Sequence, residues 1–132
     1  MQSVTPADIQ NPQENIHDAC RLGQLERVKE LLEANGQLAN EQNDLQQTPI
    51  YLACQGGHIE VVKVLLAHGA DINYQDEWEK TLLHLACESG HKEIAKILDE
   101  QGSNIEGQND WKRTPLHMAC EKGHEDVVQY LI

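Results

Sequence analysis

Three histidine–cysteine pairs are the residues of this chain whose types and spacing come closest to a site for chemistry. Each histidine stands three residues before a cysteine, in the pairs His17 and Cys20, His84 and Cys87, and His117 and Cys120. On a helix, residues three apart share a face, so each pair could offer two ligands to a tetrahedral zinc ion. Each pair supplies only half of such a site, and the pairs stand in separate copies of a repeated motif. The spacing therefore favours a structural role, and we assign no metal ligand.

The rest of the sequence offers no better candidate for catalysis or for a cofactor. The segment from Asp71 begins like a calcium-binding loop, but such a loop needs glycine at its sixth position and a carboxylate at its twelfth. This chain has Asp76 and Leu82 there. The sequence contains no motif for a nucleophilic serine, a phosphate-binding loop or a dinucleotide. We therefore expect no enzyme activity, no metal and no cofactor.

The dominant pattern is a motif that returns every 33 residues. It reads Thr-Pro-Ile-Tyr-Leu-Ala-Cys from Thr48, Thr-Leu-Leu-His-Leu-Ala-Cys from Thr81 and Thr-Pro-Leu-His-Met-Ala-Cys from Thr114. A Gly-His pair follows each copy at a constant distance. A fixed period of roughly 20 to 50 residues is typical of a solenoid, in which each unit packs only on its neighbours. Such stacks present extended binding surfaces rather than enclosed catalytic pockets.

Each period predicts two short helices followed by a polar finger. The three threonines are suited to N-caps, and Pro49 and Pro115 to the first helical position, where a missing N–H costs nothing. Glycines at 57, 90 and 123 predict left-handed C-caps. Apolar residues of the second helix follow the spacing of one buried face, as at Val62, Leu65 and Leu66. Asn43, Asp76 and Asn109 supply turn chemistry to the fingers.

These motifs resemble those of ankyrin repeat proteins. The resemblance rests on Thr-Pro-Leu-His at 114–117, Gly-His-x-x-Val-Val at 57–62 and 123–128, and Gly-Ala-Asp-Ile-Asn at 69–73, and it covers residues 15–132. It implies an L-shaped unit of two helices and a hairpin, a protein-binding role, and a structural histidine that bonds turn backbone. Leu82 stands at the position where the motif has proline. Gln46, Glu79 and Lys112 replace the glycine of the hairpin tips, which argues against tight, regular tips.

We therefore predict an all-α ankyrin repeat solenoid of four helix–turn–helix units with polar, β-hairpin-like fingers. The units cover residues 14–47, 48–80, 81–113 and 114–132, and the last is incomplete. A flexible polar leader at 1–14 precedes the repeat domain at 15–132. The final helix carries an internal-repeat pattern rather than a polar cap. We expect the natural chain to continue past Ile132, or the open end to be covered by self-association.

The net charge limits the classes of partner that the chain can bind, and the cysteines indicate its cellular compartment. The formal net charge is −12, from 10 basic and 22 acidic residues. This composition argues against nucleic acid and membrane surfaces, and it favours solubility and a basic partner protein. Alternatively, the acidic residues simply solvate the outer face of the solenoid. The four cysteines occupy one position in four repeats, and stacked helices lie too far apart for a disulfide between them. We expect four reduced, buried thiols and a cytoplasmic or nuclear location.

The strongest functional signal is a row of large apolar residues at the fingertips. Leu45, Trp78 and Trp111 each stand three residues before a repeat threonine, and tryptophan is enriched at binding hot spots. Alternatively, each indole covers its own hairpin. Polar candidates complete the predicted protein-binding site: Glu77, Asp110 and Lys112 at the tips, and Glu88 and Glu121 on the first helices.

We predict a protein–protein interaction module that binds its partner on a concave surface of fingertips and first helices. Two other classes remain. The chain could be the regulatory or targeting segment of a larger enzyme or channel whose activity lies elsewhere. A catalyst in its own right would need activity that tracks a specific histidine or aspartate, and the sequence offers no candidate.

Overall fold

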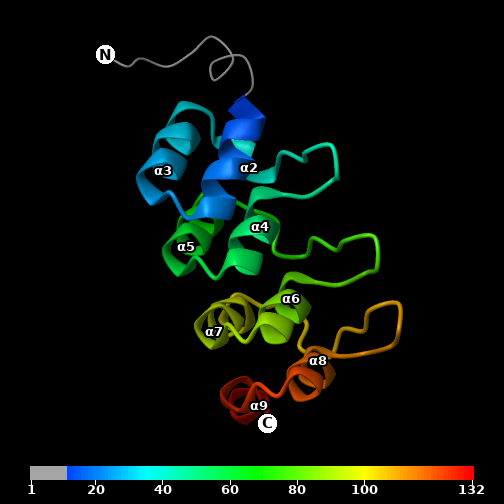
Figure 1. Cartoon of the computed structure of the whole chain (residues 1–132). Coiled ribbons are helices and arrows are strands. Elements are labelled where there is room, and N and C mark those ends of the chain that lie inside the picture. The colour runs from blue at the N-terminus through cyan, green and yellow to red at the C-terminus, as the bar shows by residue number, and fades with distance from the viewer. Residues whose placement is uncertain (1–11) are drawn as a thin grey trace.

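The computed structural model of the chain describes residues 12–132. In that range the chain forms four helix pairs stacked along one axis (Figure 1). The pairs are α2 (Pro12–Leu22) with α3 (Leu25–Ala34), α4 (Pro49–Gly56) with α5 (Ile59–Ala67), α6 (Leu82–Ser89) with α7 (Lys92–Glu100), and α8 (Pro115–Lys122) with α9 (Glu125–Leu131). The predicted all-α solenoid of four helix–turn–helix units is confirmed.

Both ends of the first unit differ from the prediction. Helix α2 begins at Pro12, inside the predicted leader, because proline is compatible with the first turn of a helix. The rest of the predicted leader, residues 1–11, lies outside the described residues. The connector after α3 contains a 3-10 helix, η1 (Gly36–Asn40), whose Leu38 and Ala39 are buried. The sequence predicts only a polar connector there.

The caps of the first helices follow the sequence prediction. The hydroxyl oxygens of Thr48, Thr81 and Thr114 accept hydrogen bonds from the backbone N–H three residues on. Gly57, at the end of α4, has a φ of 78° and therefore occupies the left-handed region that a C-cap glycine tolerates best. The first helices α4, α6 and α8 are therefore each eight residues long and are stopped at both ends by local chemistry.

The first helices form one row in the stack, and the second helices form another (Figure 1). Helix α4 packs against α2 and α6, and α6 also packs against α8. Small residues at the contacts, such as Ala53 and Ala86, are completely buried and let the helices approach closely. The core is therefore a continuous strip of aliphatic side chains rather than one globular centre.

The cysteines lie in this row of first helices, but not all of them are buried. Cys20, Cys54 and Cys87 are buried free thiols, as predicted. Cys120 is exposed, so the prediction of four buried thiols is wrong for the last repeat. The reason is the stack itself, because α8 has a neighbouring first helix on one side, α6, and no described helix covers its other side.

The fingers project to the same side of the stack and share one turn geometry (Figure 1). In the second finger, one carboxylate oxygen of Asp76 accepts hydrogen bonds from the backbone N–H of Trp78 and of Lys80, both at 2.9 Å. Asn43 and Asn109 make the same pair of bonds in the fingers before and after it. Their side chains therefore set the shape of each finger, as the sequence predicted.

The fingertips are regular even though they lack glycine. Gln46, Glu79 and Lys112 have φ values of 64°, 61° and 62°. The expectation that replacing glycine would disturb the tips is therefore wrong. The turn bonds around the Asn or Asp side chain hold these residues in the left-handed region despite the steric cost. Within the described residues the fingers form no β-ladder, only an isolated bridge between Gln75 and Thr81.

Motif histidines connect the first and third fingers to the helix row. In His84, Nδ1 accepts the Thr81 N–H at 3.1 Å, and Nε2 donates to the carbonyl of Arg113 at 2.6 Å. Burial lowers the pKa of His84, which favours the neutral ring that this pairing requires. His17 makes the equivalent contact with the carbonyl of Gln47 two fingers earlier. The structural role implied by the family resemblance is therefore observed.

Candidate functional site

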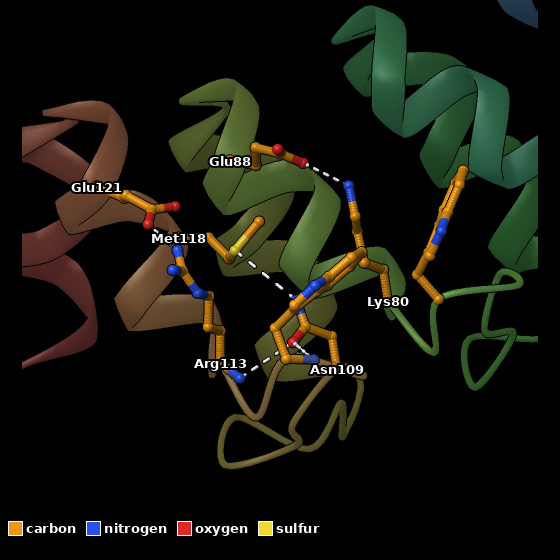
Figure 2. Close-up of a pocket in the computed structure, with 8 residues that line it drawn as sticks. Lys80, Glu88, Asn109, Arg113, Met118 and Glu121 are labelled. Carbon is orange, nitrogen blue, oxygen red and sulfur yellow. Dashed lines mark hydrogen bonds and ion pairs between the residues drawn. The ribbon is translucent and has the colours of Figure 1, made fainter.

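The fingers and the first helices enclose a groove that contains two neighbouring hollows. The larger, about 470 Å³, lies between the second and third fingers, and we call it the Trp78–Trp111 hollow. Its lining consists of Trp78, Lys80, Glu88, Asn109, Trp111, Arg113, Met118 and Glu121. Figure 2 shows that these side chains come from two fingers and from the helices behind them. A single partner segment lying there would contact two repeats at once.

Both indoles of the chain lie on this hollow. The exposed fraction is 43% for Trp78 and 58% for Trp111, so each presents much of its ring to solvent. The ammonium of Lys80 lies 5.9 Å from the centre of the Trp78 ring, within the range of a cation–π contact. Neither indole is folded away into the core. The walls of the hollow are therefore aromatic and available for contact.

The charges on the floor of the hollow are paired. Lys80 forms an ion pair with Glu88 at 3.0 Å, and Arg113 forms an ion pair with Glu121 (Figure 2). Both pairs join the base of a finger to the end of the first helix behind it. Two cations therefore balance two carboxylates, and the hollow has no net charge. Met118 adds a flexible apolar surface between the pairs.

The second hollow, about 330 Å³, lies between the first and second fingers, and we call it the Tyr51–Tyr74 hollow. Its aromatic lining comes from Tyr51, Tyr74 and Trp78, and its charged lining from Asp76 and Glu77. Leu45 and four glutamines complete it. Trp78 lines both hollows, so it forms the wall between them.

Hydrogen bonds fix the shape of this second hollow. The Tyr51 hydroxyl donates to Asp76 at 3.1 Å, and the Tyr74 hydroxyl donates to the carbonyl of Gln46 at 2.6 Å. The two tyrosine rings meet edge to face, with centres 5.5 Å apart. Burial, followed by the charge of Asp76, raises the pKa of both tyrosines. Tyr51 thus replaces the motif histidine of the other repeats as the link from helix to finger.

Comparison with known proteins decides the family. The family model for ankyrin repeats (3 copies) matches residues 16–109 and 69–132. The chain belongs to the ankyrin repeat family. Protein ACCELERATED CELL DEATH 6 of Arabidopsis thaliana is 43% identical over 51 residues, and Ankyrin repeat domain-containing protein 7 of Homo sapiens is 37% identical over 51 residues. Each match covers 39% of this chain, but only 8% and 20% of those relatives, respectively.

Ankyrin repeats are in general protein–protein interaction modules, and they are typically not catalytic. Within residues 12–132, no group of three or more histidine, cysteine or carboxylate side chains is placed to hold a metal ion. None of the helices in that range is long and apolar enough to span a membrane.

The ankyrin groove brings together most, but not all, of the predicted site residues. Trp78, Trp111, Glu88 and Glu121 line the first hollow, and Leu45, Glu77 and Trp78 line the second. Asp110 and Lys112 are exposed on the third fingertip and line neither of these hollows. The side chain of Glu88 is only 25% exposed and is paired with Lys80, so its role in partner contact stays a prediction.

The basic partners and the tyrosines of this ankyrin groove were not predicted from the sequence. Lys80 and Arg113 were not among the predicted site residues, although they stand one repeat apart, as do Glu88 and Glu121. Opposite charges that recur together at the repeat period were the signal that could have revealed these pairs. Nothing comparable in the sequence marks the Tyr51–Tyr74 contact, which depends on the distance between two repeats.

Proposed function

We propose that this ankyrin repeat chain binds a partner protein through the groove formed by its fingers and first helices, and that it has no catalytic activity of its own. The observation that carries the proposal is the position of Trp78 and Trp111. Both indoles are about half exposed and line one hollow of about 470 Å³. Large aromatic side chains beside a partly enclosed apolar space are typical of the centre of a protein interface.

The rigidity of the groove supports the same proposal. Side chains of Asn43, Asp76 and Asn109 hold the finger turns, and His17 and His84 tie fingers to helices. A partner would therefore meet walls that are already ordered, and little conformational entropy would be lost on binding. Of the predicted contacts, Leu45, Glu77, Trp78, Trp111 and Glu121 have the strongest support, because each lines a hollow and is exposed.

A second candidate is a regulatory or targeting role within a larger protein. The lengths of the relatives favour it, since the matched segments are 8% and 20% of those proteins. In this case the groove would bind a partner, or another part of the same protein, while the activity of the whole lies elsewhere. The two candidates use the same groove, so the same variants test both.

The experiment compares capture of proteins by the wild-type chain and by the Trp78→Ala/Trp111→Ala variant. Truncating a hot-spot tryptophan costs about 2 kcal/mol or more, which corresponds to roughly a thirtyfold loss of affinity. The matched control is Glu60→Ala/Lys63→Ala, which removes an exposed ion pair on α5, away from the fingers. Partner affinity that survives in the tryptophan variant, together with a melting temperature lowered by several degrees, would show that the indoles serve the fold instead.

A further inference from the structure

The two hollows differ in charge, and this difference favours different side chains of a partner. In the Trp78–Trp111 hollow, each of the two carboxylates has a basic partner, in the pairs Lys80–Glu88 and Arg113–Glu121. In the Tyr51–Tyr74 hollow, Asp76 and Glu77 contribute two carboxylates. None of the described residues that line this hollow is lysine, arginine or histidine. One hollow is therefore neutral, and its neighbour is anionic.

The neutral hollow is suited to an apolar side chain. Its ion pairs already satisfy their charges, so a charged group from a partner would lose hydration without gaining a free counter-ion. Two indoles and the thioether of Met118 provide the surface against which an aliphatic or aromatic side chain can pack.

The anionic hollow is suited to a cation. Asp76 already accepts hydrogen bonds from the hydroxyl of Tyr51 and from the backbone N–H groups of Trp78 and Lys80. It is held in place by these bonds, yet its negative charge is not neutralised by them. Glu77 is exposed beside it. Tyr51 and Tyr74 line this hollow but are buried, so Trp78, which is 43% exposed, offers the open aromatic ring beside the carboxylates. Aromatic faces attract lysine and arginine side chains within about 6 Å. Carboxylates and aromatic rings in one hollow are thus complementary to a long basic side chain.

We propose that the groove recognises a partner segment with a lysine or arginine in the Tyr51–Tyr74 hollow and an apolar side chain in the Trp78–Trp111 hollow. This inference rests on the proposed function, since it specifies what the same groove binds. The hollows lie in adjacent repeats, so the two side chains stand about 10 Å apart, which is the diameter of one helix. Trp78 contacts both side chains because it lines both hollows.

The chain itself suggests a variant that removes the charge and keeps the fold. Asn43 and Asn109 hold the same turn that Asp76 holds, so Asp76→Asn should preserve the bonds to the finger backbone. Glu77→Gln keeps the size of that side chain. The matched control is Glu79→Gln/Asp110→Asn, which removes the same amount of charge from exposed fingertip residues outside both hollows.

The probe is a library of random 16-residue peptides, selected on the immobilised wild-type chain. Peptides that bind wild-type but not Trp78→Ala/Trp111→Ala are retained, and their affinities are measured for the charge variant and its control. We expect the retained peptides to share a basic and an apolar residue. Asp76→Asn/Glu77→Gln should weaken them about tenfold, and the control should change affinity less than twofold. Replacing the basic residue of the peptide by glutamine should abolish the difference between wild-type and the charge variant.

The outcomes separate the inference from the function on which it rests. Retained peptides that lack a basic residue, or that bind the charge variant as well as wild-type, would overturn the cation proposal and leave the groove as the binding surface. A selection that yields no peptide dependent on Trp78 and Trp111 would count against the proposed function itself. Equal losses in the charge variant and in its control would also overturn the cation proposal, because they would reflect net charge rather than the hollow.

Discussion

The backbone N–H of Asp110 donates a 2.9 Å hydrogen bond to the carbonyl of Trp78, and so joins the tips of two neighbouring fingers. Both fingers carry a tryptophan, and both tryptophans line the same hollow. The bond therefore helps to fix the separation of the two indoles before any partner arrives. It gives Asp110 a role that its side chain alone does not indicate.

We expect Asp110→Pro to loosen this link without unfolding the chain. Asp110 is the second residue of the turn closed by the bond from the Lys112 N–H to the Asn109 carbonyl, a position that proline accepts. Proline removes the donor, so hydrogen exchange at Trp111 and Lys112 should become faster while the helices keep their protection. Asp44→Pro, at the same position of the first described finger, is the control. Unchanged exchange in the third finger would contradict a role for this bond.

The thiols should separate into one fast class and one slow class. Cys120 is exposed, whereas Cys20, Cys54 and Cys87 are buried, and burial raises the pKa of Cys20 and Cys87 to about 12. Since the thiolate is the reactive form, the buried thiols should react slowly at pH 8. A thiol reagent should therefore label one cysteine quickly in the folded chain and four after denaturation. The Cys120→Ser variant should lack the fast phase of labelling. Fast labelling of two or more cysteines in the folded chain would contradict the burial of Cys20, Cys54 and Cys87.

Stability should fall as the pH drops below about 6.5 because of His84. Burial lowers the pKa of His84 in the folded state, so the unfolded chain binds a proton there at a higher pH than the folded chain does. The unfolded state is then favoured as pH falls through the ordinary histidine value. Protonation would also place an N–H where Nδ1 now accepts the Thr81 N–H. The check is the free energy of unfolding at pH 7.0, 6.0 and 5.5.

His84→Gln is the comparison for that pH series. The variant should be less stable by about 1 to 3 kcal/mol at pH 7, since a buried donor and a buried acceptor lose their partner. The decline of its stability between pH 7.0 and 5.5 should also be shallower than in wild-type. Parallel pH profiles for the two chains would show that His84 does not contribute to the acid sensitivity.

The helices and their caps could be predicted because their causes are local. A threonine before the helix and a glycine after it act within a few residues of sequence, as at Thr48 and Gly57. The regular fingertips were not predicted, because the effect of a missing glycine at Gln46 was considered without the turn bonds of Asn43. The exposure of Cys120 was also missed, since equivalent sequence positions are equally buried only where a neighbour lies on both sides.

The groove was predicted only in part, for a similar reason. The row of Leu45, Trp78 and Trp111 follows from the period alone, because equivalent positions of a solenoid lie on one edge. The ion pair of Lys80 with Glu88 depends on how far the second finger extends over α6, the helix that follows it. The contact of Tyr51 with Tyr74 depends on the distance between repeats. These distances are properties of the packed structure and are not set by any short sequence motif.

The most direct test of the groove as the binding surface uses the two tryptophans as reporters. The chain contains only two, so its indole N–H region in a ¹H–¹⁵N NMR spectrum should contain two signals, both from the groove. A peptide selected on the wild-type chain, or a captured partner, would be titrated into labelled protein. We predict that both indole signals shift or broaden on binding, while the backbone amide signals of α5 and α7 remain unchanged. Binding that moves the amides of α5 or α7 and leaves both indole signals unchanged would contradict the account.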